Sequence, residues 1–472
     1  MVLQSDSAGP IWGWAQADQK VTVTFGDFEK TVQVDSTGLW RTTLPSMQAS
    51  KQSHKLQITA GNEKVQFTDI LVGEVWFCSG QSNMGFALKS DRNFSRAAVG
   101  TKLPYLRYCE VEKQIEAFPV ERVGTKWTVS SPETTPRYSA VAFYFGRELQ
   151  DKLDVPIGII HCSWGGTPIE AWMPREAFHP GREGLVHDYK WLQAREREYY
   201  QKVKTASEKW LQQNDENARG ERWLTNPTPW PQHLITENPK YPTVLYNGMV
   251  HPIIPFRIRG VLWYQGESNV KVWNRYYDLM DAWISIWKQR WGISDLPFYY
   301  VQIAPWNIYK EDNLPRLREA QLQILRDIEN TGMAVIHDTV NNLNNIHPND
   351  KQPVAHRLAL WALAQTYGRD IVYSGPLYRD YSIEGDRIRI NFDHAKGLQT
   401  NDGKVPDSFV IAGEDKKFMP AEANIDGETI ILHSSKVSRP TAARFAWSKT
   451  AQPNLINAAN LPASPFRTDN GL

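Results

Sequence analysis

The chain has little cysteine, no excess of either charge and no long hydrophobic run. Its 472 residues include three cysteines, and 53 Lys and Arg residues stand against 52 Asp and Glu residues, for a formal net charge of +1. Cys78, Cys109 and Cys162 are too few and too unevenly spaced for a disulfide scaffold or a cysteine-based zinc site. The balanced charge gives no electrostatic reason to expect nucleic acid or an anionic membrane as a partner. No apolar run approaches the roughly 20 residues that a membrane-spanning helix needs.

Metal-binding and phosphate-binding motifs are missing as well. His-x-x-x-His and Cys-x-x-Cys do not occur, and no glycine-rich phosphate loop follows a predicted strand. We therefore expect no metal and no other cofactor. A hydrophobic fraction of 41% with 22% charged residues is typical of a globular protein. Cys78 and Cys162 end apolar runs, so we expect buried core thiols at both positions.

Residues 1–69 form short runs in which apolar and polar side chains alternate, and this pattern predicts β-strands. Turn residues such as those at 35–38 separate the runs, and no cluster of titratable side chains appears among them. Evenly spaced, half-buried strands are typical of an antiparallel β-sandwich, so we predict an N-terminal β-sandwich domain over residues 1–69. The predicted strands are Val21–Phe25, Lys30–Val34, Leu39–Leu44 and Lys55–Thr59.

From about residue 70 apolar strands alternate with helices. This alternation predicts right-handed β-α-β units, and so an α/β fold with a parallel sheet flanked by helices over residues 70–370. The predicted strands are Val72–Cys78, Ile157–Cys162, Gly260–Tyr264, Phe298–Ile303 and Met333–His337. The predicted helices are Ser139–Leu153, Arg275–Arg290 and Leu317–Asn330.

Two further segments complete the predicted organisation. A highly charged stretch predicts a helical insertion at about residues 180–240, ending in an irregular loop at 227–242. Such an insertion forms either a wall of the substrate cleft or a solvated hairpin. Beyond residue 371, short strands separated by Gly-Asp and Asp-Gly turns predict a C-terminal β-rich domain over residues 371–472.

The first strand of the α/β region ends at an abrupt turn. Residues 75–78 are an apolar run suited to a strand buried on both faces, and Gly80 permits a tight turn just before Ser82. A hydroxyl just past the carboxyl end of a buried strand lies where α/β sheets bind their ligands. Alone, this segment is also consistent with an ordinary β-α turn capped by a serine. It is not the Gly-x-Ser-x-Gly elbow, because Met84 replaces the second glycine.

Three other polar segments accompany Ser82. Their sequences are Ser163-Trp164-Gly165-Gly166-Thr167, Trp263-Tyr264-Gln265-Gly266-Glu267-Ser268-Asn269 and Asn345-Ile346-His347-Pro348. With residues 80–84, Gly-Gln-Ser-Asn-Met, these four blocks resemble the SGNH (GDSL-like) hydrolases, and within them the sialate O-acetylesterase family of carbohydrate esterases. Residues 10–15 and 461–467 resemble the two ends of that family, so the resemblance covers nearly the whole chain.

The resemblance implies a serine esterase that removes acetyl groups from sugar hydroxyls, with O-acetylated sialic acid as the substrate. The reaction would pass through an acetyl-enzyme on Ser82. An alcohol needs an adjacent base at neutral pH, and the resemblance assigns that role to His347. For the oxyanion it implies the amide of Ser82 itself, a backbone amide at Gly165 or Gly166, and the side-chain amide of Gln265.

One position departs from the family's pattern. Relatives carry an Asp two or three residues before the catalytic histidine, whereas this chain has Asn344 and Asn345 there. Asn can orient an imidazole but cannot offset its positive charge. The sequence leaves three possibilities: a Ser–His dyad assisted by a backbone carbonyl, an acid supplied by Asp338, or an acid supplied by Glu267.

Two other functions fit the same sequence. The four blocks also serve deacetylation of a plant polysaccharide such as xylan or xyloglucan, and the missing Asp is compatible with a carbohydrate-binding protein whose site has decayed. We expect an acetylated sugar or glycan as the partner, and neither nucleic acid nor a membrane. The chain opens partway into a predicted strand, so we expect that a leader has been removed and that the protein is periplasmic or secreted.

Overall fold

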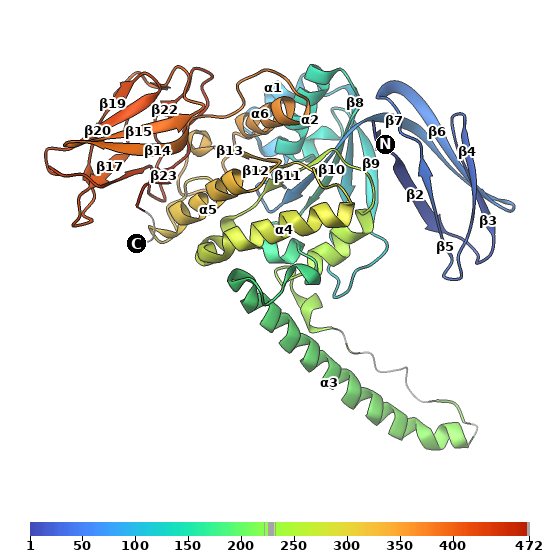
Figure 1. Cartoon of the computed structure of the whole chain (residues 1–472). Coiled ribbons are helices and arrows are strands. Elements are labelled where there is room, and N and C mark those ends of the chain that lie inside the picture. The colour runs from blue at the N-terminus through green and yellow to red at the C-terminus, as the bar shows by residue number, and fades with distance from the viewer. Residues whose placement is uncertain (221, 225–230, 232, 470–472) are drawn as a thin grey trace.

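A long sheet flanked by helices occupies the middle of the molecule, with a β-rich unit on either side and one helix projecting away (Figure 1). The structure is a computed structural model, and it describes residues 1–220, 222–224, 231 and 233–469. The N-terminal residues form the β-rich unit at one end, and the C-terminal residues form the unit at the other end. The predicted α/β fold with flanking β units is confirmed.

The central sheet has the strand order β13-β12-β11-β7-β10-β8-β9. Its strands are β7 (Glu63–Gly80), β8 (Leu103–Val111), β9 (Thr125–Ser130), β10 (Ile157–Ser163), β11 (Gly260–Tyr264), β12 (Phe298–Val301) and β13 (Thr331–Ala334). Neighbouring strands are parallel, except that β9 is antiparallel to β8. All five predicted strands are present, but β8 and β9 were not predicted, because polar side chains interrupt the apolar pattern of both.

Helices cover both faces of this sheet. Helices α2 (Ala140–Leu153) and α6 (Gln352–Trp361) pack on one face, while α4 (Tyr276–Trp291) and α5 (Asn313–Asp327) pack on the other; the short α1 spans Phe94–Ala98. Trp76 and Cys78 of β7 are buried in the core under α2 and α6. Val75 and Phe77 are buried in the core under α4 and α5. A strand buried on both faces has to be apolar throughout, which explains the run at 75–78. The cysteines are free and buried, as predicted for Cys78 and Cys162.

Strand β7 is longer than predicted and joins two parts of the molecule. Residues 63–67 pair antiparallel with β6 (Ser50–Ala60), residues 71–73 pair parallel with β1 (Val2–Gln4), and residues 74–80 pair with β10. Strand pairs within residues 1–69 are antiparallel, whereas β1 pairs parallel with residues 71–73 of β7, which lie beyond the predicted boundary and enter the parallel sheet. Strand β7 also runs through residue 69 without a break. The domain boundaries at 69 and 370 stay predictions.

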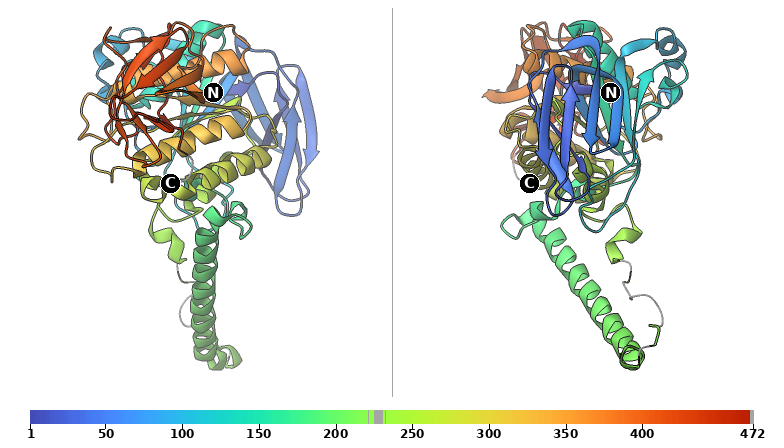
Figure 2. Two further views of the ribbon diagram at one scale, coloured as in Figure 1. Left: turned by 60° about the vertical axis from the view of Figure 1, so that its left-hand side comes forward. Right: turned by 90° about the vertical axis from the view of Figure 1, so that its right-hand side faces the viewer.

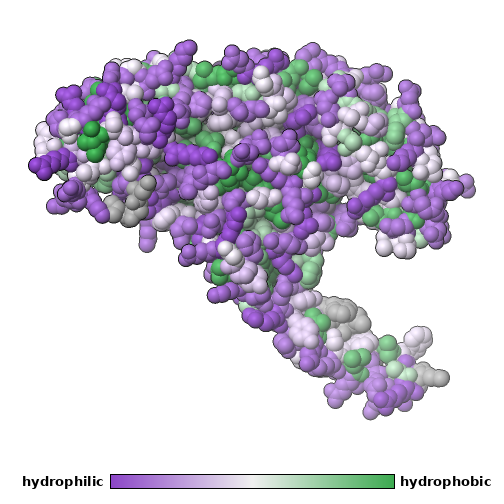
Figure 3. All heavy atoms as spheres, in the orientation of Figure 1, coloured by the Kyte–Doolittle hydropathy of each residue, from purple (hydrophilic) through white to green (hydrophobic). Residues whose placement is uncertain are grey.

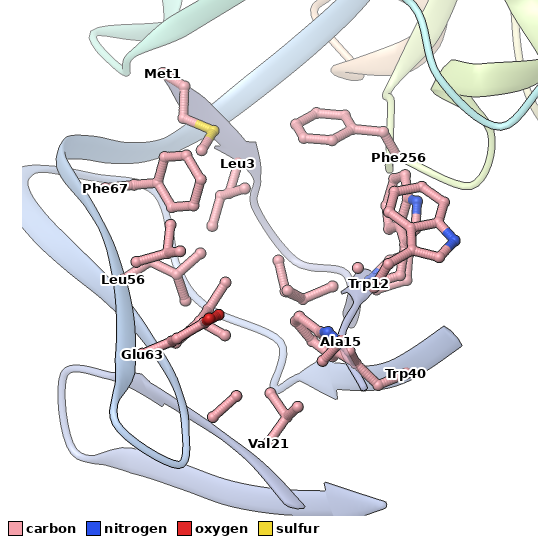
Figure 4. Close-up of a pocket in the computed structure, with 17 residues that line it drawn as sticks. Met1, Leu3, Trp12, Ala15, Val21, Trp40, Leu56, Glu63, Phe67 and Phe256 are labelled. Atoms are coloured by element: carbon pink, nitrogen blue, oxygen red, sulfur yellow. The ribbon is translucent and has the colours of Figure 1, made fainter. Parts of the chain in front are cut away.

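The rest of the N-terminal unit forms two layers. Strands β3 (Lys20–Phe25) and β4 (Phe28–Gln33) extend the β6 sheet, while β2 (Gly9–Trp14) and β5 (Leu39–Leu44) pair with each other. A cavity of about 340 Å³ lies between the layers, with Trp12, Trp40, Phe67 and Phe256 among its lining residues (Figure 4). No residue of the four blocks lines this cavity, so it is not the candidate site.

The C-terminal unit consists mainly of two four-stranded antiparallel sheets that share one core. Its strands are β14 (Leu377–Glu384), β15 (Arg387–Asp393), β16 (Gln399–Thr400), β17 (Phe409–Ala412), β18 (Met419–Pro420), β19 (Glu422–Asp426), β20 (Thr429–His433), β21 (Ala442–Phe445), β22 (Leu455–Ile456) and β23 (Phe466–Arg467). The last strand, β23, returns to the central α/β region, where Arg467 forms an ion pair with Glu319 of α5 at 2.7 Å. Gln302 donates a hydrogen bond to Ser464 Oγ at 3.2 Å, which adds a second attachment.

Helix α3 (Glu183–Arg219) projects from the body as a single 37-residue helix (Figures 1 and 2). It begins close to the predicted start of the helical insertion, and Leu185 and Leu192 are buried at its base. Hydrophilic residues dominate its visible surface (Figure 3), and no helix among the described residues is long and apolar enough to cross a membrane. The predicted irregular loop at 227–242 falls partly on residues 225–230 and 232, which lie outside the described residues.

A buried carboxylate ties the first strand to the central sheet. Glu74 of β7 accepts hydrogen bonds from Ser5 Oγ at 2.6 Å, from Tyr367 Oη at 2.8 Å and from Arg259 Nε at 2.5 Å. Its side chain is only 6% exposed, so the arginine partner is what makes burial of the charge tolerable.

Replacing Glu74 by Ala is expected to lower the free energy of unfolding by roughly 3 kcal/mol, because it leaves Arg259 without its buried partner. Urea-induced unfolding followed by tryptophan fluorescence measures the change. The matched control is Glu384→Ala, which removes an exposed partner of Arg389 and should cost less than about 1 kcal/mol. Equal losses in the two variants would contradict this role of Glu74.

Candidate active site

The loop after β7 brings Ser82 to the carboxyl edge of the central sheet. Gly80 has a φ of 141°, and a Cβ there would lie 2.2 Å from the carbonyl oxygen of Tyr264, so only glycine fits the turn. The backbone amide of Gln81 then donates to that same carbonyl at 3.0 Å. This bond fixes the residue before Ser82 against the end of β11.

Ser82 and His347, which are 265 positions apart in the chain, lie within hydrogen-bonding distance. Ser82 Oγ lies 2.8 Å from Nε2 of His347, and both residues are half-buried. Burial, and then the positive charge of Lys351, lower the pKa of His347 below its ordinary value. A neutral imidazole that accepts the serine proton is the arrangement needed to activate an alcohol.

No described residue forms a hydrogen bond with Nδ1 of His347, the ring nitrogen on the side away from Ser82. Asn345 instead accepts a hydrogen bond from the backbone amide of His347 at 3.0 Å, and Asn344 Oδ1 accepts one from Asn307. Asn344 and Asn345 therefore form hydrogen bonds within and beside the loop, and neither forms one with the imidazole ring.

Neither candidate acid forms a hydrogen bond with His347. Both oxygens of Asp338 accept from Arg357, at 2.7 and 2.5 Å. Burial would raise the pKa of Asp338, but these bonds outweigh it and lower the pKa. Glu267 accepts from Asn83 Nδ2 at 2.6 Å, and burial raises the pKa of this carboxyl. Within the described residues the geometry is therefore that of a Ser–His pair without a carboxylate.

The backbone around Gly165 faces the serine. A Cβ on Gly165 would come within 3.3 Å of Ser82 Cβ, whereas one on Gly166 would lie 3.9 Å from Cε of Lys240. The amide N–H groups of Ser82 and Gly165 donate to no described residue. Of the two glycines considered from the sequence, Gly165 thus offers a donor beside Ser82 that has no acceptor among the described residues.

The side-chain amide of Gln265 is already engaged. Its Nε2 donates to Asn269 Oδ1 at 2.7 Å and to the carbonyl oxygen of Thr167 at 3.2 Å, while its Oε1 accepts from Tyr276 at 3.0 Å. Both amide hydrogens of Gln265 therefore have acceptors in the buried interior. Gln265 has to give up one of these bonds to donate to an oxyanion.

A buried polar network that the sequence did not reveal continues behind Gln265. Asn269 donates to Glu170 at 2.8 Å, and Arg275 donates to Glu170 at 2.9 Å and to Asp188 of α3 at 2.7 Å. Burial, and then the nearby charge of Glu170, raise the pKa of Asp188 to about 7. The base of the projecting helix is thus connected by hydrogen bonds to the third of the four blocks, residues 263–269.

A second hydrogen-bonded chain, also missed, lies under the loop of Ser82. Ser163 Oγ is 2.8 Å from His161 Nε2, and His161 Nδ1 is 2.8 Å from a carboxylate oxygen of Glu110. The order of groups is that of a nucleophile, a base and an acid. However, Gly85 covers Ser163, since a Cβ there would lie 2.9 Å from Ser163 Oγ. The alternation of His161 and Ser163 along β10, which puts both on one face, was the available sequence signal.

Comparisons with known proteins point to one family. Residues 230–362, which include the third block and His347, match the model of a family described as carbohydrate esterase, sialic acid-specific acetylesterase. The sialate O-acetylesterases of Rattus norvegicus and Homo sapiens are each 28% identical to the chain over 99% of its length, and the matches cover 92% and 90% of those proteins.

A solved structure extends this likeness to the whole fold. The carbohydrate acetylesterase XAC1771 from Xanthomonas citri superimposes with a TM-score of 0.84 and 33% identity, over 100% of this chain and 97% of that one. The match spans both β-rich units as well as the central sheet. The chain belongs to the sialate O-acetylesterase family of carbohydrate esterases and is a carboxylic-ester hydrolase that removes O-acetyl groups from carbohydrates.

Proposed function

We propose that the protein is a serine esterase in which Ser82 is the nucleophile, His347 is the base and O-acetylated sialic acid is the substrate. The observation that carries this proposal is the 2.8 Å hydrogen bond from Ser82 to Nε2 of a histidine whose pKa is lowered. A neutral imidazole at that distance can take the hydroxyl proton as the serine oxygen attacks.

In the first half of the reaction, Ser82 Oγ bonds to the acetyl carbonyl carbon and its proton moves to His347 Nε2. The amides of Ser82 and Gly165 donate to the resulting oxyanion. As the tetrahedral intermediate collapses, the imidazolium returns its proton to the departing sugar oxygen and leaves acetyl-Ser82. Water then attacks this ester with the same base, which releases acetate and restores the serine.

His347 performs both proton transfers without a carboxylate on Nδ1, as a Ser–His dyad. Its loop is held by the bond from its own backbone amide to Asn345. The lowered pKa makes the imidazolium a stronger acid, which favours the step that protonates the leaving sugar oxygen. The absence of the Asp is therefore compatible with turnover.

The names of the relatives support sialic acid as the acetylated sugar, and so does the charge near the second block. Lys113 Nζ lies 5.4 Å from the ring centre of half-buried Trp164, and exposed Lys240 lies beside Gly166. A cation over an aromatic ring, with a second cation beside the same block of sequence, can bind a sugar that carries a carboxylate. Acetate release from O-acetylated sialosides should therefore exceed release from acetylated xylo-oligosaccharides; the reverse preference would contradict this substrate.

Replacing Ser82 by Ala should lower kcat by roughly 10⁴-fold or more, because only Ser82 forms the acetyl-enzyme. Acetate release from 4-nitrophenyl acetate measures the rate. A fluorophosphonate should label wild-type Ser82, as peptide mass spectrometry can locate. Ser163→Ala is the matched control and should still be labelled. Label on Ser163, or a Ser82→Ala variant with more than about a tenth of the rate, would exclude Ser82 as the nucleophile.

The pH dependence of kcat/KM should follow the neutral form of His347. Activity rises with pH as the ring loses its proton, and because burial and then Lys351 lower the pKa of His347, half-maximal activity should fall below 6.5. Asn345→Asp adds an anion that favours the charged ring, so its midpoint should move to higher pH. Rate profiles from about pH 4 to 9, which bracket the ordinary pKa of histidine, test both expected midpoints. A wild-type midpoint well above 6.5 would contradict the first.

Gln265→Ala should lower kcat by roughly 100- to 1,000-fold with KM little changed, if Gln265 releases Thr167 and donates to the oxyanion in the transition state. The bond to Thr167 is the longer of its two donated bonds and is the one expected to break. Steady-state kinetics with one acetylated sialoside separate the two constants. A loss confined to KM would make Gln265 a substrate-positioning residue instead.

A further inference from the structure

We propose that Lys351 is a positioning residue of the esterase: its buried ammonium group supplies a fixed positive charge to the site and, through Asn83, holds the His347 loop beside Ser82. This inference rests on the proposed serine mechanism. It assigns a role to a cation that none of the four blocks contains, and it answers how the base is supported when no carboxylate contacts its ring.

Lys351 lies inside the protein at the start of α6. Its side chain has no exposed surface, and Nζ donates to Asn83 Oδ1 at 2.5 Å. The ammonium group also faces the rings of Phe86 and Tyr264, whose centres are 5.0 and 4.9 Å away. Its backbone amide donates to Asp91 at 2.8 Å, which fixes where the side chain begins. One hydrogen bond and two aromatic faces thus surround a fully buried cation.

Asn83 connects this cation to both reacting side chains. It follows Ser82 directly, and its Nδ2 donates to Glu267 Oε1 at 2.6 Å and to the carbonyl oxygen of Ile346 at 3.1 Å. Ile346 precedes His347, so one amide group joins the loop of the nucleophile to the loop of the base. Because Lys351 binds the oxygen of this amide, the nitrogen must point toward Glu267 and Ile346.

The charge of Lys351 acts on His347 in the same direction as burial. Burial lowers the pKa of Lys351 to about 7, although the anions Glu267 and Asp91 oppose that shift. Tyr264 also faces the ammonium group, and burial raises the pKa of its hydroxyl, which stays neutral. The cation disfavours a second positive charge on His347 and thereby favours the form that accepts the serine proton.

A buried ammonium group does not add to the stability of the fold simply by being buried. Replacing buried charged groups by apolar side chains of similar volume is often neutral or stabilising, so stability alone does not call for an ammonium group here. Strongly perturbed titratable groups cluster at functional sites. Lys351 combines such a perturbation with direct hydrogen bonding to the residue after the nucleophile.

The test is Lys351→Met, which keeps the length and apolar contacts of the side chain and removes the charge. The acid-side midpoint of kcat/KM should move to higher pH by at least about half a unit, because the repulsion of the imidazolium is lost. KM should stay within about twofold, since Lys351 is buried away from substrate. Lys404→Met, which removes a lysine that is 79% exposed in the C-terminal unit, is the matched control and should leave the profile unchanged.

Two further variants separate the charge from the hydrogen bonds. Asn83→Ala keeps the cation but releases the His347 loop, so kcat should fall at least about tenfold while the midpoint stays near that of the wild type. The double variant Lys351→Met with Glu267→Gln removes both buried charges and carries the test if Lys351→Met alone does not fold. Its midpoint should also move upward, since the Lys351 cation is again missing.

An unchanged midpoint in a folded Lys351→Met protein, or in the folded double variant, would overturn the proposal. Circular dichroism and the thermal midpoint report whether each variant is folded. Failure of the serine mechanism itself would look different: wild-type kcat/KM would show no acid-side midpoint at all, or Ser82→Ala would remain active. The two failures are therefore distinguished by measurements on the wild type and on Ser82→Ala.

Discussion

The site depends on the backbone hydrogen bonds at the end of β7. The amide of Gln81 donates to the carbonyl of Tyr264 at the end of β11, and the amide of Trp164 donates to the carbonyl of Gly80 from the end of β10. The strands carry three of the four blocks, so these two bonds hold the blocks in register at one edge of the sheet. A side chain at Gly80 would push the strands apart, because its Cβ would overlap the Tyr264 carbonyl. The chemistry therefore begins with a backbone constraint.

Above that edge, buried polar groups take over the positioning. Glu170 accepts hydrogen bonds from Asn269 and Arg275 and so fixes the block at residues 263–269. Asn83 joins the loop of Ser82 to the loop of His347. Both networks are almost completely enclosed, where a hydrogen bond is stronger and an unmatched charge more costly than in water. Such interiors hold side chains in single orientations, which is what a dyad without a carboxylate requires of its loops.

The sequence was informative where the information is local. Apolar runs placed the five strands of the parallel core, and the four blocks identified the family and pointed to Ser82 and His347, which the structure brings within hydrogen-bonding distance. Strands β8 and β9 were missed because polar side chains interrupt their apolar patterns. Their place in the sheet depends on pairing with segments far away in the chain. The same reason hid three facts about the site: Gln265 has acceptors for both amide hydrogens, the two candidate acids are bound elsewhere, and Lys351 is buried. Each follows from tertiary contacts and none from spacing.

The sharing of β7 between the N-terminal unit and the central sheet bears on how the protein can change in evolution. A module that is attached by a linker can be lost or exchanged with little effect on its neighbour. Here the strand that pairs with β6 at one end leads at the other into the loop of Ser82, the proposed nucleophile. Deleting the first 60 or so residues would expose the unpaired first half of that strand, and exposed edges promote aggregation. We therefore expect the N-terminal unit to unfold together with the esterase sheet and to be inherited with it.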